Sequence, residues 1–557
     1  MKYFSKISPA KILLISAIII GFILRVFMLD KIPQGFNWDE ASVSYNAYSL
    51  SETGKDEFGK SWPLIIESFG DYKTGIYSIL LAPIIKIFGF SIFIARIPNV
   101  FVGLAVILAS YYLALAFFKN KLPASLVALL ISISPWAVHT SRFVLEWHPG
   151  IPLAIIGGYF LLTSKKNSIN IVWAAILLSL SMYFYHSLRL FAPLLGLSYI
   201  LINSSWAIKQ RKMIFFATLA ALITLIPLLI TAKSTNLLSR PSAVSIFSDS
   251  NTEEANEGIY RETITKTPWF RIYNNSTVVI SKKFISRYLS HFSPQFLFLG
   301  EDASPRLGID GVGKLYLTSL PFMLIGVVTL LQRRNNKDLF LLSWLLLAPL
   351  ASSLTKDSPH ALRSLIFLPT FQVLTASGIL VFYRWLKNKK IKKIKLITAT
   401  IAASYLFGLG FFLNRYFLFY PEDTAPYWQD GYKEMVEAVN IHESSFDRVF
   451  VSKSYGQPHI FFALFTPISP DVYQSEVINQ VESFNSRISQ LGKISFLPIE
   501  KSLLCEENSL VVSAGEIDSS NLPKIKTVYL ATRYQEKKVM FELFDTNDPF
   551  LRNKVCN

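Results

Sequence analysis

The chain of 557 residues is 51% hydrophobic and only 17% charged, with a mean hydropathy of +0.37, whereas a soluble chain carries about a quarter charged residues. Its apolar residues gather in long runs, which excludes a soluble globular protein and predicts a polytopic membrane protein. The net charge of +17 does not indicate nucleic-acid binding, because the basic residues form short clusters between apolar runs, as they do where they set membrane topology.

The apolar runs predict an all-α bundle of about 11–13 spans. Eleven stretches are candidate spans: 12–29, 94–118, 122–138, 150–163, 170–186, 190–206, 213–232, 315–331, 338–354, 364–383 and 396–413. The first is too long for the apolar part of a typical signal peptide and many spans follow it, so we expect it to be retained. A further stretch, 74–89, has about sixteen residues, short of the ~20 that a span usually needs.

Basic clusters predict the side on which each loop lies. They occur at the N-terminus and at 119–121, 164–166, 209–212, 332–337 and 384–395, and we place all of them in the cytoplasm. The eleven spans then alternate correctly only if the stretch 74–89 does not cross, so we expect a re-entrant or interfacial helix there. The segments 30–74, 139–149, 233–314 and 355–363, and the tail from about 414, then lie outside the cytoplasmic membrane, and the N-terminus lies in the cytoplasm.

The tail is less apolar than the rest and predicts a small extracytoplasmic α/β domain. "DRVFVSKSY" and "SLVVSAG" have the pattern of strands, and "GYKEMVEAVNIH" that of an amphipathic helix. We therefore divide the chain into a membrane domain, 1–415, and a C-terminal domain, 416–557. The only two cysteines, Cys505 and Cys556, lie in the tail, where a disulfide can form on the oxidising side of a bacterial membrane.

Two adjacent carboxylates, Asp39 and Glu40, follow the first span in "NWDEASVSYNAY". Ionisable residues at span ends are costly unless they pair or line a wet cavity. Asn37 and Glu40 have the spacing of a capping box, so Glu40 has a structural reading, whereas Asp39, one residue into the first turn, is less well explained by capping. We take both acids as candidate catalytic residues, on a helix that Asn37 and Glu40 cap and that presents Asp39 to the cavity.

The other outer junctions add cations to these acids. They carry Asp71 and Lys73 in "ESFGDYKTG", Arg142 and Glu146 in "SPWAVHTSRFVLEWHPG", His186 and Arg189 in "YFYHSLRLFAPLL", and His360 and Arg363 in "TKDSPHALRS". Structural readings remain open, since Arg142 and Glu146 have the spacing of a helical ion pair, and Arg189 can snorkel beside an interfacial histidine. Lys73 can be a plain interfacial anchor. Their occurrence together on one side of the membrane favours a functional cavity.

A carboxylate beside a hydroxyl can act as a general base, and nearby cations can hold a phosphate and stabilise it as it leaves. At an outer membrane face, this combination suits glycosyl transfer from a lipid-phosphate sugar. The lipid would lie between helices, and the acceptor would enter from outside.

Four stretches resemble the bacterial membrane glycosyltransferases of the GT-C superfamily, closest to the family of protein O-mannosyltransferases and aminoarabinose lipid A transferases. They are "FNWDEASVSYNAYSLSETGKDEFG", "SFGDYKTGIYSILLAPIIKIFGFSIFIARIPN", "SPWAVHTSRFVLEWHPG" and "DSPHALRS", and the likeness covers roughly residues 1–415. The resemblance implies a multi-span helical bundle with juxtamembrane helices in the first outer loop and a polyprenyl-phosphate sugar donor, from which a hexosyl or pentosyl group moves to a protein, lipid or glycan.

The resemblance also implies roles for individual residues. Asp39 would act as base or position the acceptor, and Lys73 and Arg142, with His360 and Arg363, would contact the donor phosphate. Asp71, Glu146, His186 and Arg189 would support the site. Metal use stays open, because Asp39, Glu40 and Asp71 could hold a divalent cation and metal-free catalysis is equally compatible.

Two other functions remain open. A flippase of lipid-linked sugars would bind the same phosphate, but it predicts polar span centres or paired discontinuous helices, and these are not evident. A polysaccharide polymerase or ligase would rely on outer-loop arginines without the early pair of acids.

Overall fold

The computed structural model describes residues 8–234, 275–478, 488–530 and 538–556, together with residues 246, 260, 272 and 480. The chain divides into two compact units, each built from separated stretches. The bundle unit consists of Met1–Phe27 and Asn99–Tyr416, and the α/β unit of Met28–Pro98 and Phe417–Asn557. The first loop after α1 thus packs with the C-terminal segment. The domains predicted from the sequence, 1–415 and 416–557, assign these two stretches to different domains. In the expected outer segment 233–314, most residues from 235 to 274 lie outside the described residues.

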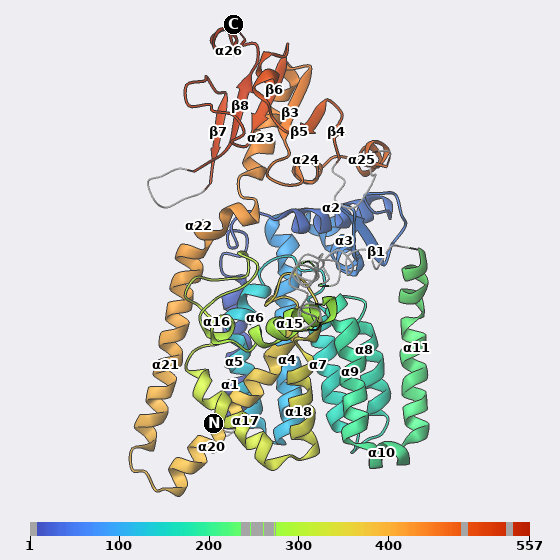
Figure 1. Cartoon of the computed structure of the whole chain (residues 1–557), viewed down its shortest axis with the longest axis vertical. Helices are drawn as coiled ribbons and strands as arrows, with labels where there is room; N and C mark the ends of the chain where they lie inside the picture. Colours follow the sequence, from blue (N-terminus) through green and yellow to red (C-terminus); the bar gives the residue numbers. More distant parts are fainter. Residues whose placement is uncertain are drawn as a thin grey trace, which may run out of the picture. The chain divides into compact units, whose positions relative to one another are not determined.

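The secondary-structure elements in the described part of the bundle unit are helices, joined by loops (Figure 1). Its elements are α1 (Pro9–Val26), α4 (Ile92–Phe118, which begins in the α/β unit), α5 (Lys121–Ser132), α6 (Pro135–Thr140), α7 (Gly150–Thr163), α8 (Asn170–Ser181), α9 (His186–Ile202), α10 (Ser204–Lys209), α11 (Arg211–Ser234), α15 (Ser276–Ser290), α16 (Pro294–Phe298), α17 (Ser319–Arg333), α18 (Asn336–Leu347), α19 (Leu350–Ser353), the 3₁₀ turn η1 (Leu365–Phe367), α20 (Leu368–Asn388) and α21 (Ile394–Asn414). Each of the eleven apolar stretches overlaps one of these helices.

Two of the expected spans are divided at a proline in the structure. The stretch 122–138 is divided into α5 and α6, and the stretch 338–354 into α18 and α19. Pro135 begins α6, and Pro349 directly precedes α19. Proline lacks the amide hydrogen that a continuous helix needs and clashes with the preceding turn, so each long apolar run becomes two shorter helices.

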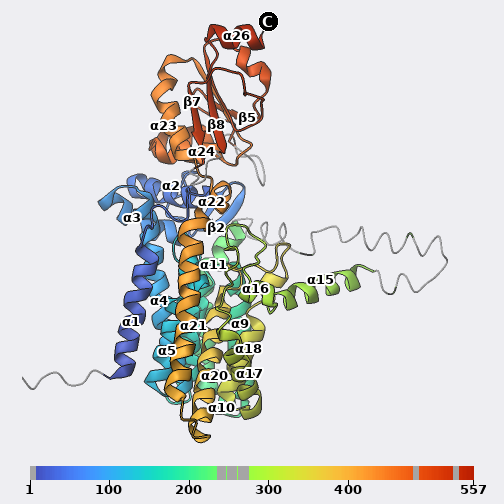
Figure 2. The same ribbon diagram turned by 90° about the vertical axis from the view of Figure 1, so that its left-hand side faces the viewer.

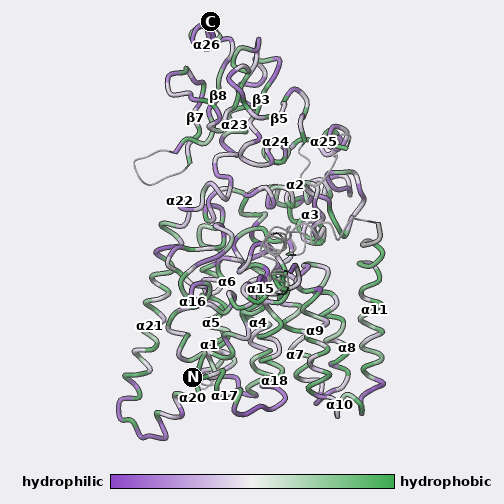
Figure 3. The backbone as a smooth tube through the Cα atoms, in the orientation of Figure 1, coloured by the Kyte–Doolittle hydropathy of each residue, from purple (hydrophilic) through white to green (hydrophobic). Residues whose placement is uncertain are grey.

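Hydropathy identifies the chain as a multi-pass membrane protein. Among the described residues, five helices are long and apolar enough to cross a membrane: 9–26, 92–118, 211–231, 365–388 and 394–428. Shorter apolar helices accompany them, and the bundle helices are hydrophobic along most of their length (Figure 3). Large apolar side chains on α11 and α21 are exposed, among them Phe215 and Phe407. In a membrane protein such side chains face lipid.

Close helix packing in the bundle depends on small residues. A Cβ atom on Gly326 of α17 would lie 2.1 Å from the Leu374 carbonyl oxygen of α20, and one on Gly378 of α20 would lie 1.8 Å from the Phe322 carbonyl oxygen of α17. Only glycine at both positions allows the two backbones to approach this closely, as is common between membrane helices.

The first stretch of the α/β unit contains α2 (Trp38–Thr53), a hairpin of β1 (Ile65–Ser68) and β2 (Asp71–Thr74), and α3 (Ile76–Phe88). The hairpin was not expected from the sequence. Helix α3 packs along α2, and the Ser78 hydroxyl donates to the Val43 carbonyl. With 13 residues, α3 is about 20 Å long, too short to cross a hydrocarbon core of about 30 Å.

The second stretch forms a mixed sheet with the strand order β4-β5-β3-β6-β8-β7. Its elements are α22 (Tyr420–Thr424), η3 (Ala425–Trp428), α23 (Tyr432–His442), η4 (Glu443–Ser445), β3 (Arg448–Ser452), α24 (Pro458–Phe465), α25 (Pro470–Val477), β4 (Gln490–Leu491), β5 (Ile494–Leu497), η5 (Lys501–Cys505), β6 (Ser509–Ser513), β7 (Lys526–Tyr529), β8 (Val539–Asp545) and α26 (Pro549–Val555). Strand β3 pairs parallel with β5 and β6, and the other pairs are antiparallel. The expected α/β domain is confirmed, with both expected strands and the helix.

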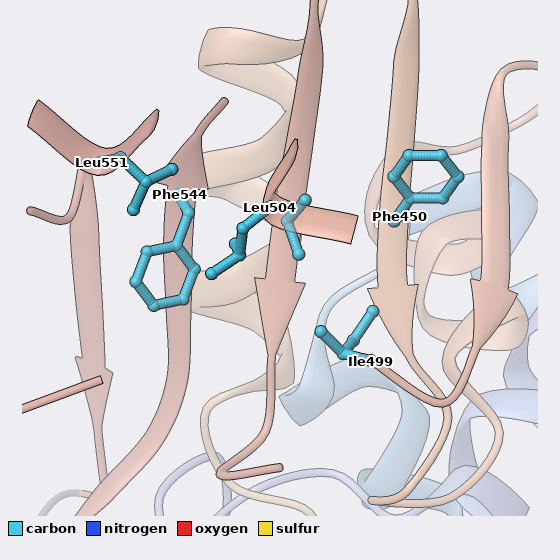
Figure 4. Packing of buried hydrophobic residues seen from close by; sticks show 6 residues of the cluster. Phe450, Ile499, Leu504, Phe544 and Leu551 are labelled. Atoms are coloured by element: carbon cyan, nitrogen blue, oxygen red, sulfur yellow. The ribbon is translucent and has the colours of Figure 1, made fainter. Parts of the chain in front are cut away.

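Helices cover both faces of this sheet (Figure 2). On one face, Tyr432 of α23 contacts Phe541 of β8, and Phe462 of α24 contacts Phe496 of β5. On the other face, a buried cluster joins the sheet to η5 and α26 (Figure 4); its members are Phe450, Ile499, Leu504, Val511, Phe544 and Leu551. A disulfide between Cys505 and Cys556 ties η5 to the end of α26, as the sequence allowed.

Candidate functional site

The N-terminus of α2 carries the two acids and has the capping box expected from the sequence. The Asn37 side chain accepts from the Asp39 amide, and the Glu40 carboxylate accepts from the Asn37 amide. Because this turn leaves free amide groups and a positive helix dipole at its start, negative side chains are favoured there. The cap fixes the backbone that presents Asp39.

Asp39 forms an ion pair with Lys73 of β2. The Asp39 side chain is 34% exposed, whereas that of Lys73 is 7% exposed. The turn between β1 and β2 places Phe69 and Gly70 at φ angles of 55° and 71°, as in two-residue hairpin turns, and the Phe69 ring lies 5.1 Å from the Lys73 Nζ atom. The hairpin therefore holds a buried cation against a carboxylate that solvent can reach.

Glu40 points away from this pair and is buried. Both of its oxygens accept from Arg96 of α4, at 2.9 Å each. The Arg96 guanidinium also donates to the carbonyl groups of Leu29, Pro33 and Gly35. These bonds connect α2, the loop before it and the start of α4, so Glu40 stabilises the fold at this point. The buried position of Glu40 does not favour the catalytic role predicted for it.

Behind Lys73 lies a buried polar network centred on Glu57. Its carboxylate accepts from Asn46 Nδ2 at 2.8 Å and from the Ser42 hydroxyl at 3.3 Å, and Ser42 also bonds Ser68 of β1 at 2.8 Å. Burial raises the pKa of Glu57 to about 8, an effect that the Asn46 bond partly offsets. Asp71 lies half-buried on β2, where its carboxylate accepts from the Tyr72 amide.

In the bundle unit, Arg142 is fully buried and caps a helix. Its guanidinium donates to the carbonyl groups of Leu24, Arg25 and Phe27 at the end of α1. The segment between α6 and α7 is not helical, so the helical spacing of Arg142 and Glu146 does not apply, and Glu146 lies half-buried in a turn. The structure therefore gives no support to the expected contact of Arg142 with a donor phosphate.

Two loops of the bundle unit carry a cluster of cations. Asp302 joins them, because its carboxylate pairs with Lys314 at 3.2 Å and accepts from the Ala361 amide at 3.0 Å. Next to Ala361, His360 is partly buried. Burial lowers its pKa well below the ordinary value, and the positive charges of Arg363 and Arg306 lower it further.

Arg363 is fixed within its loop. Its Nη1 atom donates to the Thr355 hydroxyl at 2.7 Å and to the Asp357 carbonyl at 3.0 Å, while its Nη2 atom lies 3.6 Å from the Asp357 carboxylate. The second expected pair stands apart on α9, where Arg189 donates to His186 Nδ1 and to the Met182 carbonyl. This bonding fits a local helix-end role.

No group of three or more His, Cys, Asp or Glu side chains suited to hold a metal ion occurs within the described ranges. The expected trio of Asp39, Glu40 and Asp71 is divided, since Glu40 pairs with Arg96 and Asp39 with Lys73. The side chains present do not make a metal site of these three acids.

The sequence did not single out Arg96 or Glu57, whereas Arg306 was among the charged residues that it placed at the outer ends of the spans. Arg96 stands in "RIPN" and Glu57 in "GKDEFG", so both lie in the stretches that carry the resemblance. A charged residue inside or beside an apolar run indicates a buried charge, and a buried charge requires a partner. This was the signal that could have identified them. The partner itself could not be read locally, because Arg96 and Glu40 are 56 residues apart.

No family model and no curated protein sequence matches the chain. Solved structures match along nearly its whole length. ArnT from Cupriavidus metallidurans bound to undecaprenyl phosphate aligns with a TM-score of 0.54 at 10% identity, covering 97% of this chain and 98% of that chain, and apo ArnT aligns with a TM-score of 0.52 at 10% identity, covering 96% and 97%. The oligosaccharyltransferase AglB from Archaeoglobus fulgidus, in complex with an inhibitory peptide and a dolichol-phosphate, aligns with a TM-score of 0.51 at 12% identity, covering 91% and 69%.

At identities this low, the likeness establishes the fold alone. ArnT, an aminoarabinose lipid A transferase, and AglB are both GT-C glycosyltransferases. The chain therefore has the GT-C fold that the sequence resemblance implied, with a C-terminal α/β domain.

Replacing Glu40 by Ala should destabilise the protein strongly. The change leaves the Arg96 guanidinium buried without its carboxylate, and breaking a buried pair in this way costs about 3–5 kcal/mol. Thermal unfolding of the detergent-solubilised protein measures the loss. The matched control is Glu52→Ala at the exposed far end of the same helix, with an expected change within about 0.5 kcal/mol. Equal stability of both variants would mean that the loop carbonyls alone satisfy Arg96.

The buried Glu57 should make stability depend on pH. Its pKa is raised from 4.5 to about 8, so the folded state holds the proton more tightly than the unfolded state. The resulting stabilisation is complete below the unfolded pKa and is lost as the pH rises toward the folded pKa. The melting temperature of the wild type should therefore fall between about pH 5 and pH 8, and Glu57→Gln should remove much of this fall. An identical pH dependence in both proteins would contradict the assignment.

Proposed function

We propose that the protein is an integral membrane glycosyltransferase. It moves a hexosyl or pentosyl group from a polyprenyl-phosphate donor to a hydroxyl group of a protein, lipid or glycan. The observation that carries the proposal is the solvent-accessible carboxylate of Asp39, held by a capped helix and by the buried Lys73. Support comes from the fold shared with ArnT bound to undecaprenyl phosphate and with AglB in complex with a dolichol-phosphate.

Asp39 acts as the general base. The acceptor oxygen forms a bond to C1 of the sugar as the bond from C1 to the phosphate oxygen breaks, and the bonding pair leaves with the phosphate. The acceptor proton passes to the Asp39 carboxylate. Lys73 pairs with Asp39 and orients its carboxylate, whereas Glu40 positions the helix through Arg96.

His360 and Arg363, joined by Arg306, bind the donor phosphate. The positive charges of Arg363 and Arg306 attract an anionic ligand, and the arginine fork suits phosphate oxygens. The gathering of Arg363, Arg306 and Lys314 around His360 supports this assignment. Arg142 is left out, because the carbonyl groups at the end of α1 already occupy its guanidinium.

The transfer takes place on the outer face of the cytoplasmic membrane. The positions of the basic clusters support a cytoplasmic N-terminus and a C-terminal domain outside. The disulfide between Cys505 and Cys556 supports an oxidising compartment for that domain. Charged side chains are scarce in the described helices that are long and apolar enough to cross a membrane, which favours an enzyme over a flippase.

Replacing Asp39 by Asn should remove most activity and leave the fold intact. Loss of a general base lowers the rate about 10²–10⁴-fold, and the fold should tolerate the change because the Asp39 side chain is 34% exposed, whereas that of Glu40 is 2% exposed. The assay follows sugar transfer in membranes over a panel of polyprenyl-phosphate sugars at matched expression. Glu52→Gln, on the same helix, is the control and should retain wild-type activity.

The outcomes of this assay separate the candidate functions. Transfer by the wild type and the control but not by Asp39→Asn supports both the reaction and the base, and it names the sugar. A wild type that binds a donor without consuming it would favour a flippase. Full activity of Asp39→Asn would leave only the helix-capping reading for this acid.

Replacing Arg363 by Ala should weaken donor binding. A charge-assisted hydrogen bond contributes about 1.5–3 kcal/mol, so the Kd for undecaprenyl phosphate should rise about 10- to 100-fold, measured by calorimetry on the purified full chain. Lys282→Ala, an exposed cation of α15, is the control. Unchanged binding in Arg363→Ala would remove this residue from the phosphate site.

A further inference from the structure

The C-terminal segment completes the first turn of the helix that carries Asp39. Gln429 lies in the turn between η3 and α23, and its Oε1 atom accepts from the Trp38 amide at 3.0 Å and from Asn37 Nδ2 at 2.7 Å. Gln429 is 6% exposed. The Trp38 amide is one of the four amides that a helix cannot satisfy by itself, so the cap of α2 has a second half, supplied from 391 residues away.

The same end of α2 is fixed by packing. Gly456, in the turn between β3 and α24, lies against the Trp38 ring, and a Cβ atom there would be 2.5 Å from two of the ring carbons. Its φ angle of +124° also requires glycine. Tyr455 beside it donates to the Pro426 carbonyl at 2.7 Å, which ties this turn to the segment that carries Gln429. Before α2, Gln34 Nε2 also donates to the Asp430 carboxylate of the C-terminal segment, at 2.7 Å.

We propose that Gln429 is a positioning residue for catalysis and that the C-terminal segment is part of the catalytic unit. The inference rests on the proposed function of Asp39. Gln429 fixes Asn37 and Trp38, the two residues directly before Asp39, and thereby the direction in which the Asp39 carboxylate leaves the helix. A misplacement of about 1 Å between reacting groups can lower a rate about 10²-fold, so these two bonds act on the rate more than on donor binding.

The chain offers a matched control for this inference. Gln474 of α25 also joins the C-terminal segment to the region of α2, where its Nε2 atom donates to the Asp56 carbonyl at 2.8 Å and to the Ser49 hydroxyl at 3.4 Å. It is 7% exposed, as buried as Gln429. Ser49 lies ten residues after Asp39, about 15 Å along the helix. Gln474 thus serves docking at a distance from the reacting group.

The experiment compares Gln429→Met, Gln429→Glu and Gln474→Met in the full chain, with kcat, donor KM and melting temperature measured for each. Methionine removes the acceptor oxygen at nearly constant volume, whereas glutamate keeps an acceptor and places a negative charge where the helix dipole favours it. Gln429→Met should lower kcat about 10- to 100-fold with donor KM unchanged and with no larger loss of melting temperature than Gln474→Met. Gln429→Glu should retain most of the wild-type kcat.

Three results would overturn the proposal. Equal losses of kcat in Gln429→Met and Gln474→Met would reduce Gln429 to a docking contact. A slow Gln429→Glu would show that the accepted hydrogen bonds are not what positions Asp39. A wild-type level of kcat in Gln429→Met would exclude any role in the rate. These results differ from a failure of the proposed function, in which the wild type itself transfers no sugar.

Discussion

One buried ion pair holds the start of α2 in place. Arg96 gives its guanidinium hydrogens to both oxygens of Glu40 and to three carbonyl groups of the preceding loop. A buried arginine without such partners would cost several kcal/mol, so these five bonds fix the loop, the helix and the beginning of α4 as one piece. The position of Asp39 and its contact with Lys73 depend on that piece.

Helix geometry explains why two adjacent acids have different surroundings. Consecutive residues on an α-helix point about 100° apart, so one carboxylate can face the protein while its neighbour faces solvent. Glu40 is 1% exposed, whereas the Asp39 side chain is 34% exposed. The cations divide in a comparable way, since Arg142 is enclosed by backbone carbonyls, while Arg363 lies in a loop among other positive charges. Burial thus separates the groups that maintain the fold from those that solvent can reach.

The sequence predicted what local patterns determine. Hydropathy located the helices of the bundle, the spacing of Asn37 and Glu40 predicted the capping box, and alternation predicted β3 and β6. It did not predict the hairpin of β1 and β2, because "DYK" directly precedes an apolar run and its partner strand is short. The alternative reading of Arg142 and Glu146 as a helical ion pair fails because the segment between α6 and α7 is not helical. The phosphate contact of Arg142 was implied by the resemblance, and no local pattern showed that this residue caps the end of α1. The contacts of Arg96 and Gln429 join residues far apart in the chain, and a single sequence holds no local signal for them.

The distance between Trp38 and Gln429 has a consequence for biosynthesis. At about 5–20 residues per second, the 391 residues that separate the two take roughly 20–80 s to translate. During that time, Trp38 lacks the acceptor that Gln429 provides, and α2 has only the local half of its cap. The first turn of this helix is therefore completed at a late stage of folding, after every helix of the bundle has been made. A nascent chain that stops before Gln429 can insert its spans yet cannot finish the helix that carries Asp39.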